Sequence, residues 1–229
     1  MDVEKSIIMT TIGPPQKDTS CVKDMMHLMA ENLEKITQSI NNEDIDYFLS
    51  EIHNAQRVFV IGAGRSGLVA SAFAMRLIHL GIPTYVVGET ILPTMTEGSM
   101  TGDIVVVFSC SGGTGIAAQY ATDAKKIRGA RVCLITSKPT SPVSAIADCT
   151  ILFQDHLYQK QCVEEGCSLF APLGTLFETT AWVFADAVVS GLMEVKGIDA
   201  GAMWDVHANL MGLFVIPEES YQQNKTTIH

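Results

Sequence analysis

Short runs of consecutive apolar residues alternate with amphipathic segments along most of this chain. Five runs have the length and the Val/Ile content of buried strands, and we expect strands at residues 57–62, 84–87, 103–109, 131–136 and 149–153. Apolar residues at helical spacing predict helices at residues 19–40, 42–53, 65–80, 114–128, 142–147, 175–195 and 199–213. Nearly continuous apolar strands separated by helices are typical of a parallel sheet that is covered on both faces.

The sequence therefore predicts a flavodoxin-like α/β fold, a three-layer αβα sandwich with five parallel strands in the order 2-1-3-4-5 and added N-terminal helices. We expect one domain over residues 19–215, between a loose leader over residues 1–18 and a polar tail over residues 216–229. In this order the first and third strands are neighbours, and the helices that follow them cover opposite faces. Their carboxyl ends flank the crevice where such sheets bind ligands.

Gly/Ser-rich turns follow these two strands. The first reads Gly62-Ala63-Gly64-Arg65-Ser66-Gly67, and the second reads Ser109-Cys110-Ser111-Gly112-Gly113-Thr114. Such turns direct backbone N–H groups toward one point beside a helix N-terminus, whose partial positive charge attracts anions. The second turn adds three hydroxyls, which could surround one phosphate. Together the two turns indicate a pocket for a phosphorylated small molecule.

Each turn has an alternative interpretation. The first turn is a G-x-G-x-x-G sequence, and Glu89 follows the second strand where a ribose-binding acid could lie, so a nicotinamide or flavin dinucleotide is the rival ligand. The second turn could be ordinary turn chemistry with a helix N-cap, because Ser, Gly and Thr are common in both. A dinucleotide site does not require the three clustered hydroxyls, so they favour the phosphorylated small molecule.

Composition and charge restrict the classes of partner and the compartment that we expect for this protein. The 229 residues carry a formal net charge of −10, which leaves no basic footprint for a nucleic acid or an acidic membrane surface. No apolar run approaches the roughly 20 residues of a membrane span. The six cysteines are scattered, which favours thiols in a reducing cytoplasm, and the spacing of His156, Cys162 and Cys167 fits no zinc pattern well. We therefore expect a cytoplasmic protein without a metal.

Several segments together resemble the sugar isomerase (SIS) family. The second turn has the Ser-x-Ser-Gly-x-Thr form of that family's phosphate loop. The other matching segments are residues 62–67, 73–81, 87–90, 172–179 and 207–210. The resemblance implies a cofactor-free phosphosugar ketol isomerase that interconverts 3-hexulose 6-phosphate and fructose 6-phosphate through an enediol(ate). An isomerase of a pentose or heptose phosphate, or a non-catalytic phosphosugar-binding regulatory domain, is the alternative. Gly113 stands where relatives tend to carry a longer side chain, and this departure leaves the exact substrate open.

The implied reaction needs a base beside the reacting carbons, and a carboxylate in a pocket shielded from water suits this step. The resemblance favours Glu178 as the base, although Thr175-x-x-Glu178 is equally the pattern of a capping box at a helix start. The expected phosphate ligands are Ser109, Ser111, Gly112 and Thr114, and the expected sugar ligands are Gly64, Arg65, Ser66, Glu89 and Thr175.

Two histidines are candidates for proton transfer. Fructose 6-phosphate is mainly a furanose that must open before it reacts, so a histidine that moves a proton is useful in that direction. The resemblance favours His79 and His207 for this role, although a histidine near a helix end is more often structural. It also implies a homo-oligomer, a dimer or a tetramer, in which the C-terminal segment reaches a neighbouring active site.

Overall fold

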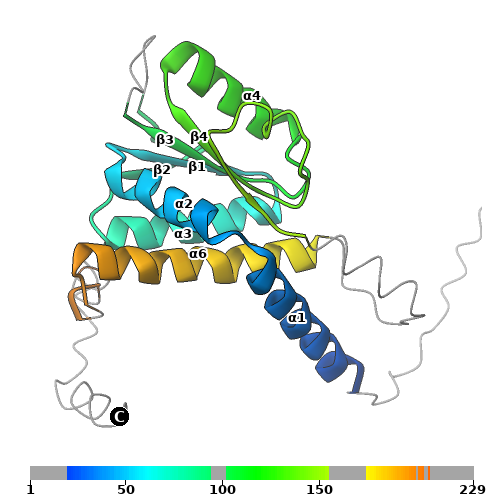
Figure 1. The fold of residues 1–229 in the computed structure, drawn as a ribbon. Coiled ribbons are helices and arrows are strands. Elements are labelled where there is room, and N and C mark those ends of the chain that lie inside the picture. Colours follow the sequence, from blue (N-terminus) through cyan, green and yellow to red (C-terminus); the bar gives the residue numbers. More distant parts are fainter. Residues whose placement is uncertain (1–19, 94–101, 155–173, 200, 204–205, 207–229) are drawn as a thin grey trace, which may run out of the picture.

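A computed structural model describes residues 20–93, 102–154, 174–199, 201–203 and 206. Its five strands form one parallel sheet in the order β2-β1-β3-β4-β5 (Figure 1). The strands are β1 (Val58–Gly62), β2 (Thr84–Val86), β3 (Ile104–Phe108), β4 (Arg131–Thr136) and β5 (Cys149–Leu152). The predicted fold class and strand order are confirmed.

Helices cover both faces of the sheet (Figure 1). One face carries α2 (Asn42–Asn54), α3 (Arg65–His79) and α6 (Thr175–Lys196), and α1 (Ser20–Ser39) packs against α6. The other face carries α4 (Gly115–Asp123), which continues as the π-helix η1 (Ala124–Arg128). This arrangement follows from the sequence, because neighbouring residues of each strand point to opposite faces.

The sheet therefore separates two apolar cores. Val58 and Val60 of β1 lie in the core under α3 and α6, whereas Phe59 and Ile61 lie in the core under α4. All four side chains are almost completely buried, which explains why the strand reads as a continuous apolar run.

The segment at residues 142–147 is a run of turns rather than the predicted short helix. The Ser144 N–H bonds to the Ser141 hydroxyl at 3.0 Å, and the Ala147 N–H bonds to the Val143 carbonyl at 2.9 Å. Directly afterwards Asp148 is tied to Val132 of β4, since its N–H and carboxylate bond to that residue's backbone at 2.7 and 2.8 Å. The chain must therefore leave the helical path after a single turn.

Some predicted segments lie outside the described residues. They are the leader over residues 1–18, the tail over residues 216–229, the loop with His156, Cys162 and Cys167, and most of the predicted helix at residues 199–213, of which residues 201–203 and 206 are helical. The domain boundaries stay a prediction.

Helix α6 corrects the expectation that no segment approaches the length of a membrane span. Its 22 residues, with a mean hydropathy of 1.3, are long and apolar enough to cross a membrane, judged by length and composition alone. Half of its most apolar stretch of 18 residues is buried inside the protein, and Phe177, Ala181 and Leu192 pack in the core under the sheet. A helix in a protein core can have the same length and apolar composition, and the burial of α6 matches that case.

Candidate functional site

The two Gly/Ser-rich turns lie side by side at the carboxyl edge of the sheet. Strands β1 and β3 are hydrogen-bonded neighbours, and Gly62 at the end of β1 is in register with Phe108 at the end of β3. After Gly62 the chain enters α3 on one face, and after the second turn it enters α4 on the other face. The turns thus flank the crevice at the switch point of the sheet, as predicted.

Glycine is required in the first turn for close packing. A Cβ atom on Gly62 would lie 2.6 Å from the backbone of Ser66, and one on Gly67 would lie 2.8 Å from the Gly62 carbonyl. Gly64 has φ 58°, a conformation that side chains rarely adopt, and it forms the N-cap of α3 without a side-chain hydrogen bond. The turn therefore brings the start of α3, with Arg65 and Ser66, tightly against the end of β1.

Each hydroxyl of the second turn makes a hydrogen bond within the turn. The Ser109 and Thr114 side-chain oxygens are 3.4 Å apart, and the Ser111 hydroxyl accepts a bond of 3.3 Å from the Gly113 N–H. The Gly112 N–H bonds to the Ser109 carbonyl at 3.0 Å and closes the turn. Thr114 is the N-cap residue of α4, but its hydroxyl makes no capping hydrogen bond. The Thr114 hydroxyl therefore does not cap the helix, which differs from the N-cap interpretation of this turn.

Arg65 and Glu178 form an ion pair at the same edge. Arg65 is the first residue of α3 and Glu178 lies in the first turn of α6, and the Arg65 Nε donates to Glu178 Oε2. The pair lines a cavity of about 320 Å³. The other lining residues are Leu68, Val69, Thr179, Trp182 and Val183. A carboxylate and a guanidinium therefore face a largely apolar cavity.

The predicted capping box at the start of α6 is not formed. Gly174, with φ 78°, is the N-cap residue, and no side chain caps the helix. The Glu178 carboxylate bonds to Arg65 instead of reaching back to the N–H of Thr175, which is the first residue of the helix. This rules out the capping interpretation of Glu178 and leaves its catalytic role as a prediction.

The structure separates the remaining candidates. Glu89 lies just beyond β2 at the same edge, with an exposed side chain. His79 is the last residue of α3, fourteen positions after Arg65, so the rise of the helix places them about 21 Å apart. His207 lies outside the described residues.

No group of three or more metal-ligating side chains is found among the described residues. His156, Cys162 and Cys167 lie outside the described residues, so the absence of a metal stays a prediction.

One buried hydroxyl at this edge escaped the sequence analysis. Ser137 follows β4, is 2% exposed, and its Oγ has no hydrogen-bond partner among the described residues. Its N–H donates to the carbonyl of Cys110 in the second turn at 3.1 Å. Thr136 strengthens this connection, because its hydroxyl donates to the same carbonyl at 3.1 Å. The signal in the sequence was the position of Ser137 directly after the fourth strand, which lies beside the third strand in the predicted order.

Comparisons with known proteins agree with this geometry. The SIS domain family model matches residues 51–155. A 3-hexulose-6-phosphate isomerase of Bacillus subtilis is 38% identical over 185 residues, which cover 80% of this chain and 96% of that protein. A 3-hexulose-6-phosphate isomerase of Mycobacterium gastri is 32% identical and is covered over 91% of its length, with 82% of this chain matched.

A solved structure is similar over most of its length. The crystal structure of a Methanococcus jannaschii protein, described as inferring a molecular function of 3-hexulose-6-phosphate isomerase, superimposes with a TM-score of 0.65 at 28% identity. The match covers 80% of this chain and 97% of that one. The resemblance in the two turns thus extends to whole relatives, and this chain belongs to the SIS domain family.

Proposed function

We propose that this protein is a phosphosugar ketol isomerase that interconverts 3-hexulose 6-phosphate and fructose 6-phosphate. The observation that carries the proposal is the ion pair of Arg65 and Glu178, which lines a cavity at the sheet edge where the hydroxyl-rich turn also lies. The names of relatives with 32–38% identity support the substrate and the reaction.

The turn from Ser109 to Thr114 suits the phosphate group. Its Ser109 and Thr114 hydroxyls lie within hydrogen-bond distance of each other, and the first N–H groups of α4 have no side-chain cap. A phosphate placed there accepts hydrogen bonds from hydroxyls and backbone N–H groups and is attracted by the helix dipole. This binding fixes the position of the sugar relative to the cavity.

Glu178 suits the role of the base that removes the substrate proton. In the direction from fructose 6-phosphate, its carboxylate removes the proton from C3, and the C–H electron pair forms the C2–C3 double bond while the C2 carbonyl electrons move to oxygen. Transfer of the C3 hydroxyl proton to the negatively charged C2 oxygen, and return of the abstracted proton from Glu178 to C2, give the 3-ketone with a hydroxyl on C2. The side chain is 13% exposed, so few water molecules compete for the proton.

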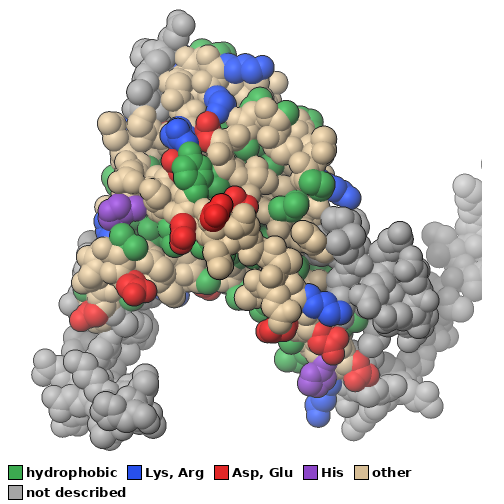
Figure 2. Space-filling model, in the orientation of Figure 1, with side chains coloured by type: hydrophobic (Ala, Val, Ile, Leu, Met, Phe, Trp, Pro, Cys, Tyr) green, Lys and Arg blue, Asp and Glu red, His purple; other side chains and the backbone are tan. Residues whose placement is uncertain are grey.

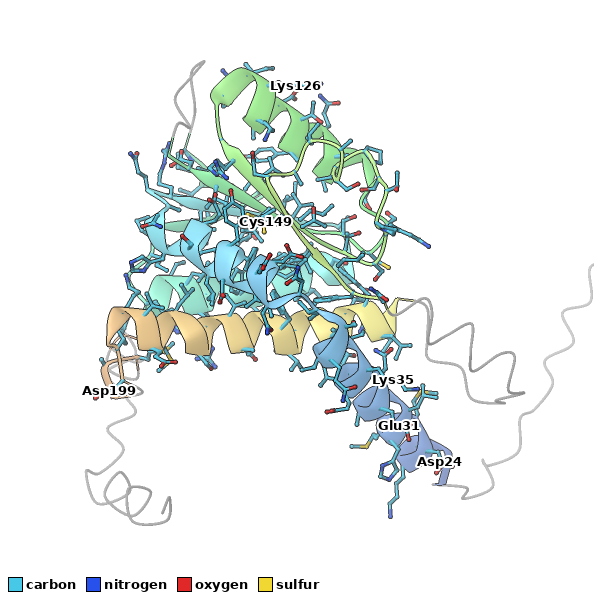
Figure 3. All side chains as sticks on the ribbon, in the orientation of Figure 1. Asp24, Glu31, Lys35, Lys126, Cys149 and Asp199 are labelled. Carbon is cyan, nitrogen blue, oxygen red and sulfur yellow. The ribbon has the colours of Figure 1, made fainter. Side chains whose placement is uncertain are left out.

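We also propose that the active protein is a homo-oligomer in which a second copy supplies His79. Within one chain His79 is at the far end of α3 from Arg65, so it acts on the same substrate only from another copy. Exposed apolar side chains support such contacts. They are Leu68, Met75 and Ile78 of α3 and Trp182 and Val183 of α6. The part of α1 that carries Asp24 and Glu31 also extends beyond the body of the protein (Figure 3).

A cytoplasmic location without a nucleic-acid partner completes the proposal. The three described cysteines, at positions 110, 133 and 149, form no disulfide, which suits a reducing compartment. On the face seen in Figure 2, Lys and Arg side chains are scattered among Asp and Glu and do not gather into a basic patch.

The test is a panel of pentose, hexulose and heptose phosphates incubated with the purified protein, with each product identified by chromatography. We expect 3-hexulose 6-phosphate to be converted to fructose 6-phosphate at the highest kcat/KM. Faster turnover of another sugar phosphate would identify that compound as the substrate. Tight binding without turnover of any compound would favour the alternative of a non-catalytic regulatory domain.

A further inference from the structure

The ion pair at the candidate site uses one atom of each partner. The Arg65 Nε bonds to Glu178 Oε2. In the described part of the chain, Glu178 Oε1 and the two terminal nitrogens of Arg65 make no hydrogen bond. Among the described residues, therefore, one atom of each partner holds the pair together and the other polar atoms remain without a hydrogen bond.

Arg65 stands where helix energetics disfavour a cation. It is the first residue of α3, and the first turn of that helix contains no acidic residue to offset its charge. The partial positive charge of a helix N-terminus repels a cation at this position. Its compensation comes from Glu178, which lies 113 residues further along the chain. A residue kept at an unfavourable position indicates a role other than stabilising its own helix.

The two partners differ in their contact with solvent. The Glu178 side chain is 13% exposed, whereas the Arg65 side chain is 63% exposed, and both line the cavity of about 320 Å³. The carboxylate is thus held in place, and the terminal nitrogens of the guanidinium can reach an anionic group that enters the cavity. Two terminal N–H groups side by side match the paired oxygens of an anion.

We infer that Arg65 is a cation shared by the catalytic base and the reaction intermediate. This inference rests on the proposed function. Arg65 holds Glu178 Oε2 through Nε, which leaves Oε1 for the substrate proton, and its terminal nitrogens bind the substrate oxygen that becomes negative in the enediolate.

The shared cation balances the charge throughout the proton transfer. The C3–H bond breaks and an O–H bond forms on Glu178, which loses its negative charge. The electron pair of that bond becomes the carbon–carbon double bond, and the negative charge appears on the former carbonyl oxygen. Because Arg65 contacts both groups, no second cation has to approach, and a donor already in place stabilises the developing charge best.

The test compares two ligands that share a phosphate. One is fructose 6-phosphate, and the other is a hydroxamate analogue of the sugar phosphate, whose planar charged group mimics the enediolate. We expect Arg65→Met to weaken hydroxamate binding by about 10- to 100-fold and to change fructose 6-phosphate binding by less than about threefold. Turnover should fall on the order of 10²-fold. Arg65→Lys should restore part of the hydroxamate affinity, because it keeps the charge.

Controls separate this inference from the proposed function. Lys126→Met removes an exposed positive charge from η1 on the opposite face of the sheet and should alter neither ligand's affinity (Figure 3). Equal weakening of both ligands by Arg65→Met would assign Arg65 to the phosphate or to the fold, and unchanged hydroxamate binding would remove it from the site. Either result refutes the shared cation. Full activity of Glu178→Gln would instead refute the proposed base.

Discussion

Adding one methyl group at Gly112 should disturb both the stability of the fold and the geometry of the second turn. The φ of Gly112 is 61°, and a Cβ atom there would lie 2.6 Å from the Cβ of Ser141. The left-handed conformation costs a non-glycine residue about 1–2 kcal/mol, and overpacking adds about 1–3 kcal/mol. We therefore expect Gly112→Ala to lower the free energy of unfolding by about 2–5 kcal/mol, or to shift the turn away from Ser141 and lose phosphate binding.

Gly113 provides a matched control in the same turn. It has no positive φ, and a Cβ atom there would lie 3.5 Å from the nearest side-chain atom, the Cδ of Pro142. Gly113→Ala should therefore change the free energy of unfolding by less than about 1 kcal/mol. Urea unfolding measures stability, and calorimetry with fructose 6-phosphate measures binding. If Gly112→Ala matches Gly113→Ala in both measurements, Ser141 does not constrain the turn as described.

Two further predictions concern groups away from the cavity. Burial alone would raise the pKa of Asp148, but hydrogen bonds from Lys125 and from the Val132 N–H together lower it below its ordinary value. Asp148→Asn should therefore cost about 1–2 kcal/mol in urea unfolding at neutral pH and progressively less as the pH falls through the lowered pKa, and a cost that stays constant with pH contradicts this. A hydrogen bond with Cys149 and burial raise the pKa of the Cys133 thiol well above its usual value. In the native protein iodoacetamide should consequently modify the half-buried Cys110 well before Cys133, as peptide mass spectrometry would show, and the reverse order would contradict the described packing.

The fold and the two turns were predictable because local sequence determines them. Strands buried on both faces must be continuously apolar, as in Ile104-Val105-Val106-Val107-Phe108, and the predicted strand order follows from their alternation with helices. The glycines of the first turn were readable for the same reason, since a strand that passes directly into a helix leaves no space for side chains at Gly62 and Gly67.

The chemistry of Glu178 could not be decided from local sequence. Thr175 and Glu178 have the spacing of a capping box, and only the left-handed Gly174 at the N-cap position and the contact with Arg65 show that the box is absent. That contact joins residues 113 positions apart, beyond any pattern of neighbouring residues. The predicted helix at residues 142–147 was wrong for a similar reason, because the tie between Asp148 and Val132 depends on the sheet.

The most direct test of the account is solvent hydrogen exchange into fructose 6-phosphate. In D₂O the wild-type protein should replace the C3 hydrogen with deuterium, which proton NMR detects as loss of the C3 signal. Glu178→Gln should slow this exchange on the order of 10² to 10⁴-fold. The control Glu194→Gln, on the exposed side of α6, should exchange at the wild-type rate. Exchange by Glu178→Gln at the wild-type rate would contradict proton removal from C3 by Glu178.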